Sequence, residues 1–161
     1  MSDLGRILRG HAGSGLVHWG ADADAIAQRV VGQGYMASPV TQRFVEPEAP
    51  WFVAERLMLE CALDLDALAA AGVSVVSPAL QGIAQIGARG GGWLAGIHGP
   101  RGVNDHGFWM RLTTPLLAAS RFVVVVDRPG WDRSRGIAAE VEYALGRNMP
   151  VFVMVPGFPA V

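Results

Sequence analysis

The stretch that decides the fold lies near the C-terminus and reads FVVVVDRPGWDRSRGIAAE, residues 122–140. It opens with five apolar residues, four of them valines, a run typical of a strand buried on both faces. The Pro129-Gly130 pair then predicts a turn. Ser134 is a suitable N-cap for a helix that ends at Gly146. The stretch therefore predicts a strand, a loop and a helix, and in open parallel sheets ligands bind beyond the carboxyl ends of such strands.

Further strands are predicted on both sides of this unit. Short apolar runs occupy residues 34–37, 73–76 and 150–155. Between the first two, a long helix beginning at Pro50 carries one apolar stripe. The stripe consists of Val53, Leu57, Cys61, Leu65 and Leu68. Strands that alternate with helices imply a parallel sheet covered by helices on both faces. We expect an α/β fold, a small doubly wound flavodoxin-like sheet of four strands in the order 2-1-3-4.

The N-terminal residues are the least patterned part of the chain. Residues 1–20 are rich in glycine, and an arm, a partner-binding tail and a disordered segment are all compatible with them. Residues 22–31 predict a short helix that is stopped by glycines. We therefore divide the chain into an N-terminal arm with a short helix, residues 1–32, and one domain, residues 33–161.

Two later segments differ from simple connections. Residues 77–104 contain eight glycines, and so long a loop in a compact domain is more often a functional lid than a plain connector. Residues 105–120 read as helical, with a break expected before Pro115, because proline disrupts a helix interior.

Composition limits the classes of function. The chain has 161 residues, of which 51% are apolar and 17% charged, so it is long and apolar enough for one compact core. The net charge of −1, without a Lys/Arg cluster, argues against nucleic-acid binding. A single cysteine, Cys61, excludes an internal disulfide, and no apolar run reaches the ~20 residues of a membrane helix. We expect a cytoplasmic protein that binds neither nucleic acid nor a membrane.

Three motifs, in the same order along the chain, resemble those of the nucleoside 2-deoxyribosyltransferase-like superfamily. The last is Ser134-x-Gly136-x-x-x-Glu140, and the longer string around it resembles an uncharacterised bacterial branch. The first is Tyr35-x-Ala-x-Pro at the end of the first predicted strand, and the middle one is the Ala-Gly-Val-x-Val-x-Ser-Pro of the second. Together the motifs cover residues 33–156. The resemblance implies a parallel α/β fold with a site at the strand ends.

The resemblance also implies catalytic roles. In this superfamily a glutamate attacks C1′ of a (deoxy)ribose, or stabilises the cation that forms there, as the base leaves. Glu140 stands at that position, and an oxocarbenium-like transition state needs a carboxylate close to the anomeric carbon. Tyr35 matches a tyrosine that positions the carboxylate and the sugar. We expect the Ser38 hydroxyl to donate a hydrogen bond to a phosphate. The alternatives are an exposed helix glutamate, as we expect for Glu142, and an ordinary strand tyrosine.

Ser134 favours a nucleotide over a nucleoside. Relatives that act on free nucleosides usually have an aspartate at this position, whereas relatives that cleave nucleoside 5′-monophosphates have a serine that binds the phosphate. A hydroxyl at a helix N-terminus attracts a phosphate that an aspartate would repel, and Arg133 and Arg135 flank Ser134. The alternative is a plain N-cap serine. Gly136 permits close approach of a ligand to the backbone, or only close helix packing.

The second catalytic acid of the superfamily has no counterpart in this chain. It normally lies on the helix before the third strand, but residues 110–120 contain no carboxylate. Asp105 upstream and Asp132 in the loop after the strand are the nearest candidates to replace it. The tryptophans that flank the expected cleft are candidates for stacking on a base, or for plain packing: Trp93, Trp109 and Trp131.

These features predict a nucleotide N-glycosidase or deoxyribosyltransferase-like enzyme that cleaves the base–sugar bond of a (deoxy)nucleoside 5′-monophosphate. A second hypothesis is a catalytically silent nucleotide-binding or sensing module, which the missing acid favours. A third is that the glycine-rich segment and the N-terminal arm serve mainly in assembly. The resemblance implies a homo-oligomer, and the mechanism requires no metal or organic cofactor.

Overall fold

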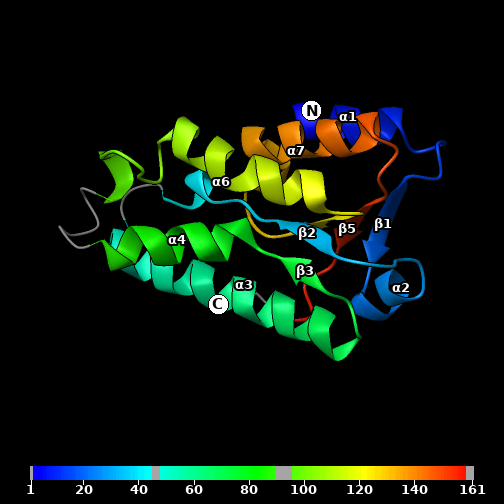
Figure 1. Ribbon diagram of the computed structural model, residues 1–161, viewed down its shortest axis with the longest axis horizontal. Coiled ribbons are helices and arrows are strands. Elements are labelled where there is room, and N and C mark those ends of the chain that lie inside the picture. Colours follow the sequence, from blue (N-terminus) through cyan, green and yellow to red (C-terminus); the bar gives the residue numbers. More distant parts are fainter. Residues whose placement is uncertain (1, 45–47, 90–95, 159–161) are drawn as a thin grey trace.

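The computed structural model describes residues 2–44, 48–89 and 96–158. Its centre is a five-stranded, all-parallel sheet with the strand order β1-β5-β4-β2-β3 (Figure 1). The strands are β1 (Val17–Ala21), β2 (Gly34–Ala37), β3 (Val75–Val76), β4 (Val123–Val126) and β5 (Val151–Met154). The expected α/β class with a doubly wound parallel sheet is confirmed.

The strand order differs from the expected four-strand order by one added strand. The four predicted strands follow one another as β3-β2-β4-β5, and β1 lies beyond them, paired with β5. Residues 1–32 are therefore more than an arm and a short helix, because they supply an edge strand of the sheet. The sequence hides this strand, since β1 includes Gly20 at φ 63° and only its first and last residues are buried.

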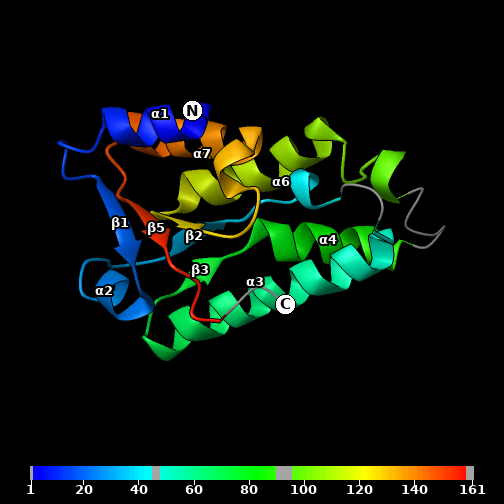
Figure 2. The same ribbon diagram turned by 180° about the vertical axis from the view of Figure 1, so that it is seen from behind.

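Helices cover both faces of the sheet. α1 (Asp3–Gly10), α6 (His106–Ala119) and α7 (Arg135–Gly146) lie on one side (Figures 1 and 2). α2 (Ala23–Ala27), α3 (Pro50–Ala70) and α4 (Pro78–Ala88) lie on the other. Two short 3-10 turns, η1 (Thr41–Arg43) and η2 (Trp131–Arg133), follow β2 and β4. These turns border the edge of the sheet at which both strands end.

The valine run behaves as its composition predicts. All four valines of β4 are fully buried, with side chains alternating between two apolar cores. Val124 and Val126 pack with Met36 on the α3 side, whereas Val123 and Val125 pack on the α7 side. Tyr35 belongs to this second core, so the side chain of the tyrosine faces the layer that contains α7.

Two sequence expectations for the middle of the chain are wrong. Residues 77–104 do not form one long loop, because α4 occupies their first part; residues 90–95, which include Trp93, lie outside the described residues. Gly82 is a packing glycine of α4, since a Cβ there would lie 2.4 Å from the Trp109 ring. Residues 106–119 form one helix that continues through Pro115, without the expected break.

The N-terminal residues are integrated with the rest of the fold. Ser2 caps α1, accepting a hydrogen bond from the Gly5 backbone N–H at 3.2 Å. Leu4 and Leu8 of α1 are buried in the same apolar core as Ile137 of α7. α1 lies directly against α7 in both views (Figures 1 and 2). Of the alternatives that the sequence left for this segment, the structure shows a packed helix followed by a strand.

Candidate functional site

A tyrosine and a glutamate meet between β2 and α7. Tyr35 lies on β2, and its hydroxyl donates a hydrogen bond to Glu140 Oε1 at 2.5 Å. Glu140 lies on the second turn of α7, after Ser134 has capped the helix by accepting a hydrogen bond from the Ile137 N–H. The resemblance predicted this contact. Two residues that are far apart in the sequence are thus joined by a direct side-chain hydrogen bond.

The surroundings of this pair change its acid–base chemistry. Glu140 is only partly exposed, and burial raises the pKa of its carboxyl group from 4.5 to about 7, while the hydrogen bond from Tyr35 opposes the rise. Burial and the neighbouring Glu140 carboxylate raise the pKa of Tyr35 well above its usual value of 10. Tyr35 is therefore a neutral hydrogen-bond donor, and Glu140 exchanges a proton near neutral pH. A carboxyl group that titrates near the working pH suits general acid–base chemistry.

The pair lines a small pocket of about 40 Å³. Its walls come from the end of β2, the start of α4, α6 and α7; the lining residues are Tyr35, Met36, Ala37, Ser38, Val40, Pro78, Ala79, Trp109, Thr113 and Glu140. β2 and β4 are neighbours in the sheet. The strand that follows β2 in sequence, β3, lies on the far side of β2, and the strand that follows β4, β5, lies on the far side of β4. The pocket therefore lies beside the point where the strand order reverses, which is the usual ligand position in open parallel sheets.

Thr113 of α6 lines the pocket beside Tyr35. Asp105, the predicted replacement for the second acid, does not line it. Its carboxylate caps α6 and accepts hydrogen bonds from the N–H groups of Phe108 at 2.9 Å and Arg101 at 2.8 Å, which lower its pKa. Among the described residues, Glu140 is the carboxylate of this pocket.

Ser38 and Trp109 are the other predicted residues that reach the pocket. The Ser38 hydroxyl is buried and forms no hydrogen bond of normal geometry with the described residues, although it lies beside the Cys61 thiol. Trp109 lines the pocket, but its indole N–H donates to the Val103 carbonyl at 2.8 Å. Its ring packs over Gly82, so the tryptophan is held as part of the wall.

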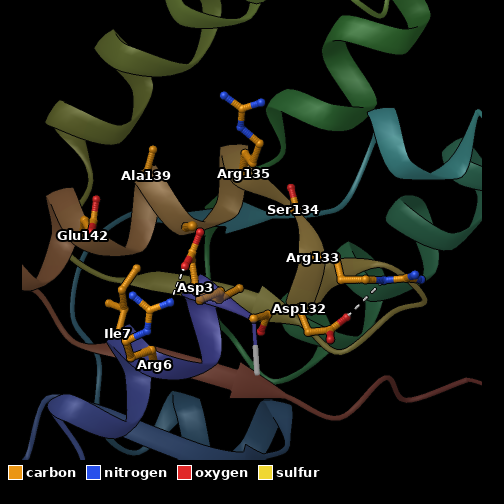
Figure 3. A pocket seen from close by; sticks show the side chains of 12 residues that line it. Asp3, Arg6, Ile7, Asp132, Arg133, Ser134, Arg135, Ala139 and Glu142 are labelled. Atoms are coloured by element: carbon orange, nitrogen blue, oxygen red, sulfur yellow. Dashed lines mark hydrogen bonds and ion pairs between the residues drawn. The ribbon is translucent and has the colours of Figure 1, made fainter.

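Ser134 lies at a different and larger cavity. A groove of about 580 Å³ runs between α1 and α7, and the side chains that line it are shown in Figure 3. Side chains of both positive and negative charge line the groove. The positive ones are Arg6, Arg133 and Arg135, and the negative ones are Asp3, Asp132 and Glu142. Neither Tyr35 nor Glu140 lines it, so this groove is separate from the pocket that holds the perturbed carboxyl group.

The remaining predicted residues fall on or near this groove. Asp132 lines it and pairs loosely with Arg133 at 3.9 Å. Glu142 lines the groove, whereas Glu140 does not. As expected, the two glutamates therefore lie on different faces of α7. Gly136 is exposed, and a Cβ there would meet only Ser134 Oγ at an ordinary 3.8 Å, so close helix–sheet packing does not require a glycine. Trp131 stacks edge-on against Trp19 at 6.2 Å rather than lining either cavity.

Comparison with known proteins places the chain in one family. A family model described as "Domain of unknown function (DUF1937)" matches residues 32–155. The chain belongs to the DUF1937 family. No curated protein and no solved structure matches the chain significantly. The DUF1937 match contains both Tyr35 and Glu140, whereas α1 and β1 precede it. The groove of Figure 3 is therefore built partly by a helix outside the DUF1937 region.

Two kinds of feature are absent from the described residues. The described ranges contain no group of three or more His, Cys, Asp or Glu side chains placed to hold a metal ion. Within those same ranges, no helix is both long and apolar enough to cross a membrane.

The DUF1937 region also contains two buried ion pairs that sequence reasoning missed. Arg43 pairs with Glu60, and Arg128 pairs with Asp64. Both carboxylates are on α3 and only 1% exposed. The sequence contains a sign of these pairs, because Glu60 and Asp64 lie four residues apart beside the apolar stripe of the long helix. A charged side chain buried there needs a partner of opposite charge.

Proposed function

We propose that the protein cleaves the base–sugar bond of a (deoxy)nucleoside 5′-monophosphate, with Glu140 acting at the anomeric carbon. The observation that carries this proposal is the hydrogen bond between Tyr35 and Glu140 in a pocket at the carboxyl ends of parallel strands. A perturbed carboxyl group in such a pocket is a recognised mark of a functional site. The motif resemblance supplies the reaction class, and the contact between the two motif residues supports it.

The chemistry follows from the charge that develops on the sugar. As the C1′–N bond breaks, its electrons leave with the base and the sugar becomes an oxocarbenium-like cation. The ionised Glu140 carboxylate, with Oε1 held by the Tyr35 hydroxyl, stabilises that cation or bonds to C1′. Water then supplies the hydroxyl group that ends on C1′, displacing Glu140 where it has bonded there, and the other proton of the water ends on the released base. Because the pKa of Glu140 is about 7, this step needs a pH at which the carboxyl group has lost its proton.

The phosphate is assigned to the start of α7. Ser134, Arg133 and Arg135 lie there, and Ser134 is six residues before Glu140. Six residues of α-helix span about 9 Å, so one nucleotide monophosphate reaches from Ser134 to Glu140 along the helix. The two groups line different cavities, and the proposal therefore requires that the phosphate bind at the start of α7 while the sugar reaches the pocket of Glu140.

A second candidate is a nucleotide-binding or sensing module without turnover. The observation that favours it is that the α6 residues lining the pocket, Trp109 and Thr113, include no carboxylate, whereas the resemblance implies a second acid on this helix. A threonine hydroxyl donates a hydrogen bond but does not protonate a leaving base at neutral pH.

The test is base release from a panel of nucleoside 5′-monophosphates, detected by chromatography, with thermal shift measured in parallel. Wild-type protein should release free base, and Glu140→Gln should abolish release while it keeps nucleotide binding. Glu55→Gln, on the exposed face of α3, is the matched control and should behave as the wild type. Binding without release by the wild type supports the second candidate. If the wild type neither binds a nucleotide nor releases base, both candidate functions are refuted.

A further inference from the structure

α3 carries two buried carboxylates that the proposed reaction does not use. Glu60 and Asp64 lie one helical turn apart, and each is 1% exposed. Burying a charge is costly unless the charge is paired and hydrogen-bonded. The helix therefore depends on partners from other segments, and these partners come from the loops that follow β2 and β4.

The first partner follows β2. Arg43 in η1 donates two hydrogen bonds to Glu60, at 2.7 Å and 3.1 Å, in a fork that involves both carboxylate oxygens. Arg43 is only 9% exposed. The pair thus fixes to α3 the loop that begins with Ser38, directly after Tyr35 and the end of β2.

The second partner follows β4. Arg128 donates to both oxygens of Asp64, at 2.7 Å and 3.2 Å, and it is 3% exposed. The Arg128 carbonyl accepts a hydrogen bond from the Trp131 N–H at 3.0 Å, which closes the turn that leads into η2. η2 ends at Ser134, the cap of α7, so this pair fixes the start of the helix that carries Glu140.

The two loops also touch each other. Gly130 has a φ of 91°, and a Cβ on it would lie 3.1 Å from Gln42 Cβ in η1. The loop after β4 therefore packs directly against the loop after β2. The two loops and α3 form one closed unit, with an ion pair on each side and Gly130 packed against the Gln42 side chain.

We propose that Arg43, Glu60, Asp64 and Arg128 are positioning residues, which hold the loops after β2 and β4 so that Tyr35 and Glu140 stay in contact. Buried ion pairs are a poor source of stability, because well-packed apolar residues of similar size often stabilise a fold as well or better. Their forked geometry instead specifies distance and orientation. This inference rests on the proposed function only for the role of the Tyr35–Glu140 pocket in binding and cleaving a nucleotide; the positioning itself does not depend on that function.

The decisive variant replaces one pair by apolar residues of similar size, Asp64→Leu together with Arg128→Met. If the pair positions the loop, this double variant should fold with stability close to that of the wild type. However, α7 should then move relative to β2, and the pKa of Glu140 should fall by about one unit or more, because hydration of the carboxyl group outweighs the rise caused by loss of the Tyr35 hydrogen bond. The pKa is measured by NMR titration of protein labelled with ¹³C at the glutamate carboxyl groups. Nucleotide monophosphate binding, measured by calorimetry, should weaken about tenfold or more.

A control and a milder variant complete the experiment. Glu48→Leu with Arg56→Met removes a partly exposed ion pair of the α3 region and should leave the Glu140 pKa unchanged. Arg128→Lys keeps the charge but loses the fork, and it replaces the double variant if that protein does not fold. A stable double variant with an unchanged Glu140 pKa overturns the proposal. If the wild type binds no nucleotide, the proposed function fails, whereas the pKa comparison still decides whether the pairs position Glu140.

Discussion

The protonation of Glu140 makes the free energy of unfolding depend on pH. Burial raises its pKa from 4.5 to about 7, so between these values the folded state binds more protons than the unfolded state. The folded state is then favoured at low pH, and this contribution is lost as the pH rises through 7. The upper limit of the loss is on the order of 3 kcal/mol, from about 1.4 kcal/mol for each unit of pKa.

Glu140→Gln should remove this dependence. The variant has no carboxyl proton to lose, so relative to the wild type it should gain stability as the pH rises from 4.5 to 7. Urea unfolding of both proteins at several pH values in this window measures the difference. Comparing the two proteins cancels the other groups that titrate in the same window. A difference that stays constant with pH would contradict the raised pKa.

Tyr35→Phe tests the other half of the pair. The Tyr35 hydroxyl stabilises the ionised form of Glu140 and lowers its pKa, so removing it should raise the pKa above 7. Base release at neutral pH should fall and should recover partly at higher pH, as the carboxyl group ionises again. NMR titration of the carboxyl group reports the pKa directly. A lower pKa in the variant would mean that the hydroxyl does not act as a donor to the carboxylate.

At the scale of whole elements, packing between helices explains features that the sequence left ambiguous. Glycine in residues 77–104 suggested a loop, because glycine destabilises helix interiors. In α4, however, Gly82 makes room for the Trp109 ring of α6, a contact between residues that no local pattern joins. Close helix packing of this kind outweighs propensity, and only the three-dimensional arrangement reveals it.

Gly82→Ala should therefore destabilise the protein. The added methyl group would lie 2.4 Å from the Trp109 ring, and an overpacked contact between two helices costs about 1–3 kcal/mol. Gly146→Ala is the matched control, because nothing lies within 4 Å of a Cβ at the end of α7. That variant should be neutral or gain about 0.5–1 kcal/mol. Urea unfolding measures both, and equal effects would mean that α4 and α6 do not pack closely at Gly82.

The sequence predicted those elements whose environment is uniform along their length. The valines of β4 are buried on both faces, so their pattern is unambiguous, and the spacing from Ser134 to Glu140 follows from one regular helix. The sequence did not predict β1, which is an edge strand with a glycine near its end. The contacts of Thr113 and Arg128 were also missed, because their partners lie on distant segments and each depends on the complete fold.

For the whole molecule, the resemblance predicts a homo-oligomer. The surface of α3 offers exposed apolar side chains at Trp51, Phe52 and Leu59, which a contact between subunits would cover. Light scattering across a tenfold range of protein concentration should give a mass above that of one 17.1 kDa chain. A monodisperse monomer over the whole range would contradict the prediction.

The pairing of β1 with β5 affects the order in which the protein is completed during synthesis. Val17 pairs with Val151, so the strand that leaves the ribosome first must wait for the strand that leaves it last. Contacts between distant parts of a chain form slowly, because the intervening loop must close before they contribute. During this delay, the buried residues Val17 and Ala21 of β1 lack their partner strand, and exposed apolar surface of this kind promotes aggregation. The edge strand thus joins the sheet only after β5 has been synthesised.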